Sequence, residues 1–356
     1  MNREWHDKIF SVTESGFGQL ALDIFHFQYG ANKVYNSYVN ALGITPSTVD
    51  EIEKIPFLPI SFFKTDEIKT GKFNAEVVFK SSGTTQTINS QHHVKDVSIY
   101  IQSFTTAFKK MYGDLQECCV LGLLPSYLEK GNSSLVYMVD DLIKQSQHPQ
   151  SGFYLYDLEK LKESLFSLER ANQKTLLIGV TYALLDFAEK FPPDSYREPL
   201  TNTIIMETGG MKGRREELTR MEVHDQLKKA FGKTEIHSEY GMTELLSQAY
   251  AKKEGRFQYP PWMKVLIRDD EDPLTVWSSE FGVGSRESIV VSQKLRTPNS
   301  ELRTITGAIN IIDLANVYSC SFIATDDIGK LYGDKSFEVL GRMDGSDLRG
   351  CSLLTV

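Results

Sequence analysis

Continuous apolar runs that alternate with amphipathic segments are the feature that most constrains the fold of this chain. Three such runs occupy residues 118–124, 175–180 and 203–207. A strand without a polar face is typical of a parallel sheet that is covered on both sides. Apolar residues at helical spacing separate the runs, over 96–112, 133–144, 181–190 (capped by Thr181) and 214–231. A further short strand is expected at 234–238. The pattern predicts an α/β fold with parallel or mixed sheets flanked by helices.

The two ends of the chain differ from this middle part. Aromatic and aliphatic residues recur at helical intervals in residues 1–40, and two prolines in 55–60 then favour an extended packing arm. After about Pro260 the helical spacing fades, and short strand-like runs follow at 264–267, 289–291, 309–312, 322–324 and 337–340. We therefore expect an α/β core with an N-terminal helical arm in residues 1–259 and a β-rich subdomain in residues 260–356.

Composition argues against several classes of protein. The 356 residues carry a formal net charge of -8, so we expect no nucleic-acid partner. No apolar run approaches the ~20 residues that span a bilayer. The N-terminus lacks the apolar core of a signal peptide. The four cysteines lie in no C-x-x-C spacing, and Cys118 and Cys119 are expected in the core. We expect a cytoplasmic protein without a membrane span.

Small, hydroxyl-bearing residues follow a predicted strand at 76–79, in the order Ser81-Ser82-Gly83-Thr84-Thr85-Gln86. Ser and Thr supply hydroxyl donors without bulk, and glycine lets the backbone approach a ligand closely. The loop could therefore hold phosphate oxygens. It is not a Walker A motif, because no Gly-Lys-Ser/Thr triplet closes it. An ordinary turn would explain the loop alone equally well.

Three further segments carry polar residues beside glycines. In Glu239-Tyr240-Gly241-Met242-Thr243-Glu244, Thr243 could hold a phosphate oxygen, Glu244 a Mg²⁺ ion, and Tyr240 a base. A helix start with Thr243 as its N-cap is the alternative. Asp327, in a predicted loop at 324–331, could bind a ribose diol, although a β-turn explains it equally well. Arg342 could reach ribose or phosphate.

In order and spacing, these segments resemble the motifs of the adenylate-forming superfamily, which includes acyl-CoA synthetases and aryl-CoA ligases. The resemblance runs from about residue 55 to the C-terminus. It implies ATP and Mg²⁺ as cofactors, a carboxylic acid as substrate, and attack of the carboxylate on the α-phosphorus to give acyl-AMP. It implies Glu244 as the Mg²⁺ ligand and, for the nucleotide, these residues: Ser81, Ser82, Gly83, Thr84, Thr85, Gly209, Gly210, Tyr240, Gly241, Thr243, Asp327 and Arg342.

The chain departs from that superfamily in two places. Gln86 stands where glycine is usual, and no Pro-Lys-Gly follows it. Only Met343 to Val356 follow the Gly-Arg pair, so we expect the mobile C-terminal domain and its catalytic lysine to be absent. Lys212 could supply the missing charge as a catalytic residue, together with Arg214. A solvated helix start is an equal alternative for both.

Cys351, close to the end of the sequence and near Arg349, suggests an acyl acceptor. Thiolate attack on acyl-AMP would give an acyl-enzyme thioester. A cysteine at this place is similar to that of the acyl-protein synthetases of bacterial luminescence, the LuxE family, in which the cysteine carries a fatty acid before its delivery to a reductase. Residues 55–64 and 209–214 also resemble that family. A passive tail residue is the alternative for Cys351.

We therefore expect an enzyme that activates a carboxylic, preferably fatty, acid and loads it on Cys351. A reductase or a carrier protein would be its partner. Two alternatives stay open: a ligase that transfers directly to CoA, and a non-catalytic nucleotide-binding partner in a biosynthetic complex. His92 and His93 point to opposite faces of a predicted strand, which favours a surface pair or one contact to phosphate over a metal site. His237 could border the acyl pocket, although a satisfied core residue is commoner.

Overall fold

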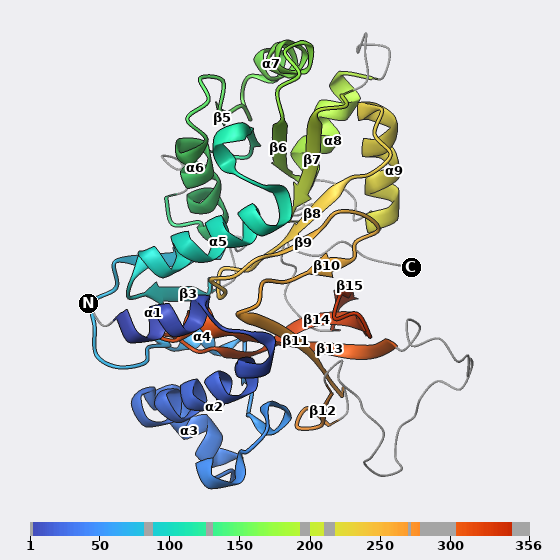
Figure 1. Cartoon of the computed structure of the whole chain (residues 1–356). Helices are drawn as coiled ribbons and strands as arrows, with labels where there is room; N and C mark the ends of the chain where they lie inside the picture. The colour runs from blue at the N-terminus through green and yellow to red at the C-terminus, as the bar shows by residue number, and fades with distance from the viewer. Residues whose placement is uncertain are drawn as a thin grey trace.

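A computed structural model of the chain describes residues 3–81, 88–125, 131–192, 200–209, 218–269, 272–277 and 304–343 (Figure 1). One large mixed sheet runs through the molecule in the strand order β12-β11-β13-β14-β15-β10-β9-β8-β7-β6-β4-β5. The predicted mixed α/β architecture is confirmed. Residue 260 lies between β10 and β11 in the sequence, and both strands belong to this one sheet. The division into two domains at this residue therefore stays a prediction.

The parallel part of the sheet consists of the three strands predicted from apolar runs and two shorter ones. These are β4 (Cys119–Leu123), β5 (Gly152–Phe153), β6 (Thr175–Val180), β7 (Thr203–Thr208) and β8 (His237–Tyr240). Every residue of β4 and β6 is buried, as expected of strands that are covered on both faces. Strand β8 begins three residues later than the predicted strand.

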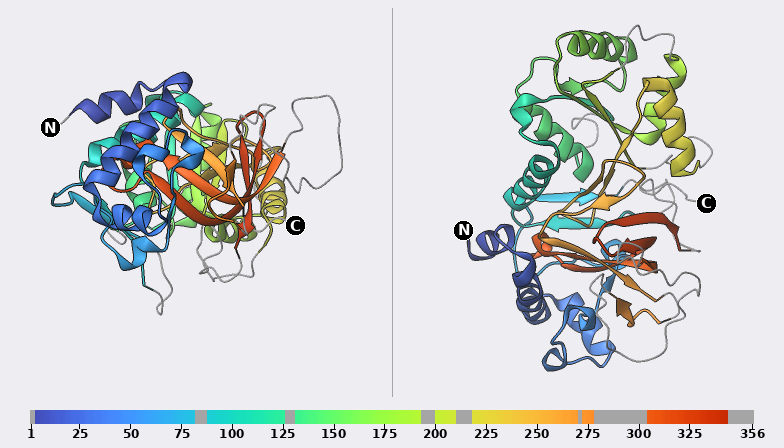
Figure 2. Two further views of the ribbon diagram at one scale, coloured as in Figure 1. Left: turned by 90° about the horizontal axis from the view of Figure 1, so that it is seen from below. Right: turned by 45° about the vertical axis from the view of Figure 1, so that its right-hand side comes forward.

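Helices cover both faces of the parallel strands (Figures 1 and 2). Those of this part are α5 (Val97–Tyr112), α6 (Ser134–Ser146), α7 (Leu158–Arg170), α8 (Thr181–Lys190) and α9 (Arg220–Phe231), with the short η3 (Leu115–Glu117). Two predicted helix starts were wrong. Helix α9 begins at Arg220, because Thr219 and Glu222 form a capping box there. Thr181 is the first residue of α8 rather than its cap, and its hydroxyl oxygen lies 3.1 Å from the Glu207 carboxylate.

Antiparallel strands form the rest of the sheet and confirm the β-rich C-terminal part. They are β9 (Ala249–Ala251), β10 (Phe257–Gln258), β11 (Met263–Arg268), β12 (Val276–Trp277), β13 (Thr304–Asp313), β14 (Phe322–Tyr332) and β15 (Phe337–Arg342), with the one-turn η6 (Leu314–Asn316) after β13. The strand predicted at 289–291 lies outside the described residues.

The N-terminal segment packs against this β-rich part. It contains α1 (Arg3–Phe10), α2 (Glu14–Ala31), α3 (Lys33–Ala41), η1 (Pro46–Thr48), η2 (Ile52–Lys54), β1 (Leu58–Pro59) and α4 (Phe62–Thr65). Strand β1 pairs in parallel with β14, with Leu58 opposite Ile323, as expected of a packing arm. The buried amide of Gln28 in α2 donates to the carbonyls of Asn316 and Val317 at 3.0 Å each.

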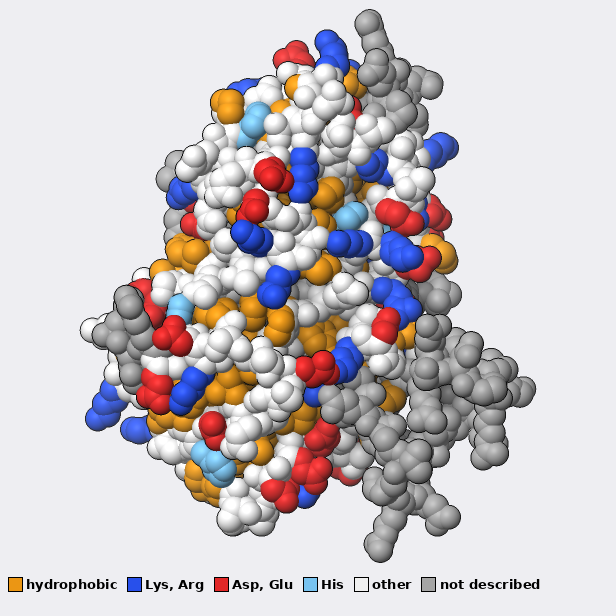
Figure 3. All heavy atoms as spheres, viewed as in Figure 1, with side chains coloured by type: hydrophobic (Ala, Val, Ile, Leu, Met, Phe, Trp, Pro, Cys, Tyr) orange, Lys and Arg blue, Asp and Glu red, His pale blue; other side chains and the backbone are white. Residues whose placement is uncertain are grey.

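A separate two-stranded hairpin, β2 (Val77–Lys80) and β3 (Gln91–Val94), lies between the two parts. Basic and acidic side chains are interspersed on the face shown in Figure 3. Among the helices that the structure describes, none is both long enough and apolar enough to cross a bilayer.

Candidate active site

Several predicted site residues meet where parallel strands end. Strands β6, β7 and β8 are in register at this edge, with Val180 opposite Thr208 and Thr208 opposite Glu239. Gly209 and Gly241 follow directly on β7 and β8. A Cβ atom at Gly241 would lie 2.5 Å from the Glu239 carboxylate, so any larger residue here would displace that carboxylate. Ligands of parallel sheets bind at this edge.

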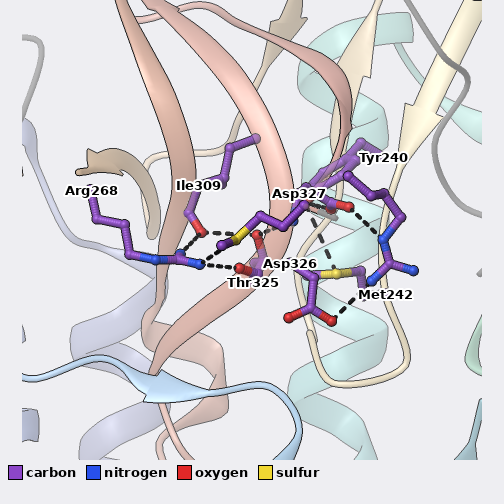
Figure 4. Close-up of polar contacts among 9 residues, drawn as sticks. Tyr240, Met242, Arg268, Ile309, Thr325, Asp326 and Asp327 are labelled. Atoms are coloured by element: carbon purple, nitrogen blue, oxygen red, sulfur yellow. Dashed lines mark hydrogen bonds and ion pairs between the residues drawn. The ribbon is translucent and has the colours of Figure 1, made fainter. Parts of the chain in front are cut away.

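The Asp327 carboxylate connects β8 to the antiparallel strands (Figure 4). The Tyr240 hydroxyl donates to Oδ2 of Asp327 at 2.8 Å. Arg342, opposite Asp327 in the pairing of β14 with β15, places its Nε 3.6 Å from Oδ1 of Asp327 and a terminal nitrogen 3.0 Å from Asp326. We call Tyr240, Asp326, Asp327 and Arg342 the arginine cluster. Three residues predicted from separate segments are thus in contact.

The loop or β-turn predicted around Asp327 was wrong. Asp327 lies inside the eleven-residue strand β14, which pairs with β13 on one side and β15 on the other. The pairing of β14 with β15 shifts register between Ile328 and Gly329, one residue beyond Asp327. An irregularity of this kind can redirect a side chain at a site. It lies beside the point at which Arg342 contacts two consecutive aspartates.

The ring of Tyr240 is enclosed by aromatic neighbours. Its centroid lies 5.7 Å from that of Phe257 and 5.5 Å from that of Phe337, and 2% of the residue is exposed. A base could stack on this ring only after a neighbouring ring has moved. The stacking role that the resemblance implies for Tyr240 therefore stays a prediction.

The segment from Thr243 to Ser247 is held by its backbone. The helix start predicted here, with Thr243 as N-cap, was wrong, because the chain makes a turn and enters β9. The Thr243 carbonyl lies 2.8 Å from Nδ1 of His92, and the Glu244 carbonyl accepts from the Asn316 amide at 2.7 Å. The Asp313 carboxylate accepts from the backbone N–H groups of Leu246 and Ser247 at 2.8 and 3.0 Å. Asp313 and Asn316 were not predicted as site residues.

His92 is not the surface residue that the sequence suggested. Only 1% of it is exposed, and the ring of Phe63 meets it edge-on. Burial lowers the pKa of His92 to about 4, although the Thr243 carbonyl and the charge of Glu244 oppose this. The imidazole is therefore neutral at pH 7. Its neighbour His93 faces the other side of β3 and lies 3.6 Å from Glu67.

The two ends of the predicted phosphate loop are tied together. The Ser81 N–H donates to the Ser90 carbonyl at 3.1 Å, and the Ser90 N–H donates to the Ser81 hydroxyl oxygen at 2.9 Å. Gly209 has a φ of 65°, and its carbonyl accepts from the Thr181 hydroxyl. Other predicted site residues lie outside the described residues, namely Ser82, Gly83, Thr84, Thr85, Gly210, Lys212 and Cys351.

A second group of buried polar side chains lies along β7 and β8. We call Thr181, Glu207, Thr208, His224, Ser238 and Glu239 the hydroxyl cluster. Nε2 of His224 is 3.2 Å from the Ser238 hydroxyl and 3.6 Å from Glu207. A catalytic triad needs its serine and its carboxylate on different imidazole nitrogens, so this arrangement does not make Ser238 a nucleophile.

The pKa values of two glutamates of the hydroxyl cluster, Glu239 and Glu207, are shifted in opposite directions. Burial raises the pKa of Glu239 to about 7, and a hydrogen bond from the Thr208 hydroxyl only partly opposes it. Burial alone would also raise the pKa of Glu207. Hydrogen bonds from His224 and Ser238, with the charges of His224 and Arg220, outweigh burial and lower it.

His237 lies at the start of β8, away from the edge where Tyr240 ends the strand. Its Nδ1 is 3.1 Å from the Tyr112 hydroxyl. The residue is half-buried, and both interpretations of His237 stay predictions.

The fold and the residues at the end of β8 define the class: the chain has the fold of the adenylate-forming ligases. It is similar to 2-hydroxyisobutyryl-CoA ligase in a postadenylation complex with 2-HIB-AMP, with a TM-score of 0.59, 10% identity, and coverage of 94% of this chain and 69% of that chain. An open conformation of that ligase with 2-HIB-AMP and CoA gives a TM-score of 0.61, 10% identity, and coverage of 94% and 71%.

The family follows from the sequence match. The family model described as acyl-protein synthetase, LuxE, matches residues 11–355, and the chain belongs to this family. No match was found among curated proteins.

Proposed function

We propose that this protein activates a carboxylic acid with ATP and then loads the acyl group on Cys351. The contact of Tyr240, Asp327 and Arg342 at the end of β8 is the observation that carries the proposal, because these three residues, to which the resemblance gives nucleotide contacts, come from separate segments and meet beside the strand edge. The acid's carboxylate oxygen would attack the α-phosphorus of ATP. The bond from that phosphorus to the bridging oxygen would break, and pyrophosphate would leave with the electron pair.

In this proposal Asp327 holds the ribose hydroxyls. An ionised carboxylate offers about four acceptor positions, so it can accept from ribose as well as from Tyr240. Arg342 keeps positive charge beside Asp327 and, through Asp326, stays fixed in place. Thr243 would contact the α-phosphate, and Ser81 would contribute its hydroxyl at the mouth of the phosphate loop. Such a reaction depends on alignment and on charge neutralisation rather than on covalent help.

Glu244 is the described residue that fits Mg²⁺ in this proposal. Mg²⁺ prefers one or two carboxylates together with phosphate oxygens. The described residues contain no group of three or more His, Cys, Asp or Glu side chains that could form an all-protein metal site, which suits this shared arrangement. When bound, Mg²⁺ would neutralise phosphate charge. Because Glu244 is fully buried, its neighbours must move aside for that role.

The other cysteines are poor acceptors. Cys118, Cys119 and Cys320 are buried free thiols, and burial raises their pKa values to about 12, 11 and 12. A thiol must ionise to act as a nucleophile. Met343, the last described residue, donates its N–H to the Asp326 carbonyl at 2.9 Å and therefore lies beside the arginine cluster. Cys351 follows eight residues later and can therefore reach at most ~29 Å from Met343.

The second step would be attack of the Cys351 thiolate on the carbonyl carbon of acyl-AMP. The carbon–oxygen bond to phosphate would break and AMP would leave, after the thiol proton has passed to solvent. A thioester on the protein and free AMP would be the products. The terminal acceptor would be a thiol or amine of a partner protein, or a reductase that consumes the thioester.

Intact-protein mass and ATP–pyrophosphate exchange, measured against a panel of fatty and aryl acids, test the proposal. We expect an acyl adduct on the wild type that hydroxylamine removes. The variant Cys351→Ser is expected to lose the adduct and keep the exchange, and the neighbouring Ser352→Ala is expected to keep both. A hydroxylamine-resistant adduct would contradict the thioester. A CoA thioester formed at full rate by Cys351→Ser would support direct transfer to CoA, and ATP binding without any exchange would support a non-catalytic role.

A further inference from the structure

His92 connects two parts of the candidate site that are 151 residues apart. It lies on β3, opposite Phe79 of β2, and β2 leads directly into Ser81. Its Nδ1 lies 2.8 Å from the carbonyl oxygen of Thr243. One side chain therefore joins the hairpin that carries the predicted phosphate loop to the turn that carries Thr243 and Glu244.

The chemistry of this contact fixes the tautomer of His92. A carbonyl oxygen can only accept, so Nδ1 must be the protonated nitrogen and Nε2 the acceptor. Nε2 is buried and has no hydrogen-bond partner among the described residues. The Thr243 carbonyl thus receives a directed hydrogen bond from a rigid ring that is itself packed against Phe63.

We infer that His92 is a positioning residue for acyl adenylation: its Nδ1–H holds the Thr243 peptide, and hence the Thr243 hydroxyl and the Glu244 carboxylate, in a fixed place relative to Ser81 at the end of β2. The inference rests on the proposed function. Asn316 holds the next carbonyl, that of Glu244, from the β-rich part. Consecutive carbonyls are therefore fixed from two different parts of the molecule, and loss of the His92 bond releases one of them. Comparable supporting residues change activity by about 10- to 100-fold.

The chain contains its own control for this inference. His93 is the next residue on the same strand, faces the opposite side and lies near Glu67 rather than Thr243. If β3 needed its histidines for a reason other than the bond to Thr243, substitution of either His92 or His93 would lower the activity. A requirement for the bond to Thr243 affects His92 alone.

Three variants separate the hydrogen bond from packing. In His92→Asn, the amide nitrogen takes the place of Nδ1 and can still donate, whereas His92→Leu cannot. We expect His92→Leu to lower kcat for ATP–pyrophosphate exchange by about 10- to 100-fold. The KM of the acid should stay nearly constant, His92→Asn should remain within about fivefold of the wild type, and His93→Leu should match the wild type. Equal loss in His92→Asn and His92→Leu, with both folded, would overturn the inference.

A readout that needs no turnover tests the bond itself. Long-range ¹⁵N–¹H correlation spectra of the whole protein should show His92 as the neutral Nδ1–H tautomer, and the Nε2–H tautomer would overturn the inference. Hydrogen exchange at the Leu246 and Ser247 amides should accelerate in His92→Leu and not in His92→Asn. If the wild type exchanges no pyrophosphate with any acid, the proposed function fails, and these two measurements still decide whether His92 positions the turn.

Discussion

The hydroxyl cluster and the arginine cluster both bury carboxyl groups next to β8, but they stabilise them in different ways. Glu239 of the hydroxyl cluster is bound by the Thr208 hydroxyl, and its pKa is raised by burial to about 7. Asp327 of the arginine cluster accepts from a hydroxyl as well, yet Arg342 lies 3.6 Å from its other oxygen. Glu239 and Tyr240 are consecutive residues of β8, so their side chains point to opposite faces of the strand. Glu239 contacts Thr208 on one face, and Tyr240 contacts Asp327 on the other.

Asp327 therefore lies beside a positive charge, whereas burial disfavours the ionised form of Glu239. A carboxylate beside a guanidinium stays ionised and keeps acceptor positions for the hydroxyls of a ligand. A buried carboxyl that is bound only by hydroxyls is easier to protonate, which suits packing between strands. We therefore expect the ligand at the arginine cluster, whereas Glu239 supports the strand edge.

The largest effect is expected from Asp327→Asn, which removes the charge that the arginine cluster is built around. The amide has one acceptor oxygen instead of two, and it carries no charge to attract the Arg342 guanidinium. Hydrogen bonds to charged groups contribute about 1.5 to 3 kcal/mol, so we expect kcat/KM for ATP to fall by about 10- to 100-fold. ATP–pyrophosphate exchange at varied ATP concentration measures this.

The matched control is Asp334→Asn, in the connection between β14 and β15. Asp334 also pairs with an arginine, Arg256, at 2.9 Å, but the pair is more exposed. Exposed pairs contribute at most about 1 kcal/mol to stability, and exchange should be unchanged. An equal loss in both variants would show that the exchange responds to net charge rather than to the arginine cluster.

The next effect concerns Glu239 and depends on pH. Its pKa rises from 4.5 to about 7 on folding, so its contribution to stability is full below pH 4.5 and is lost as the pH rises through 7. Glu239→Gln removes this loss and keeps an acceptor for Thr208. We expect the variant to be more stable than the wild type by about 1 to 3 kcal/mol at pH 8 and nearly equal to it at pH 4.5, as measured by urea denaturation.

Glu207→Gln should respond with the opposite sign. The pKa of Glu207 is lowered on folding, so its contribution is present above the unfolded pKa of 4.5 and is lost as the pH falls through the folded value. The variant should therefore be less stable than the wild type at pH 8, and the difference should shrink in acid. If both variants changed stability in the same direction at pH 8, the proposed distinction between the two glutamates would be wrong.

Local signals in the sequence were sufficient for β4, β6 and β7, but not for β5, which was not predicted, or for the start of β8. Residues 175–180 were predicted as a strand and form β6 with the same bounds, because burial on both faces leaves an uninterrupted apolar run. The capping box of Thr219 and Glu222 is also a local signal, and it would have placed the start of α9 correctly.

The contacts that organise the candidate site depend on residues far apart in the chain. Around Asp327 the sequence resembles a turn, and only pairing with β13 and β15 makes it a strand. Asp313 binds backbone groups 66 and 67 residues away, and His92 binds Thr243 from 151 residues away. Motif spacing predicted Tyr240, Asp327 and Arg342, whereas no local pattern indicates which buried side chains hold the turn after Tyr240.

Tyr240→Phe should give the smallest effect and tests how the arginine cluster meets its ligand. The change removes the hydroxyl that donates to Asp327 at 2.8 Å and keeps the ring between Phe257 and Phe337. The free energy of unfolding should fall by about 1 kcal/mol, as for one hydrogen bond. Tyr332→Phe, which removes a hydroxyl 2.7 Å from Glu338 on neighbouring strands, should cost a similar amount.

The KM of ATP then separates two roles of the Tyr240 hydroxyl. If it only occupies an oxygen of Asp327 until ribose arrives, its removal frees that oxygen and KM should change by less than about threefold, as in Tyr332→Phe. A rise in KM as large as the loss in Asp327→Asn would mean that the hydroxyl contacts the nucleotide itself. In that case Tyr240 and Asp327 would bind ATP as a unit, and the exclusive assignment of the ribose to Asp327 would have to be given up.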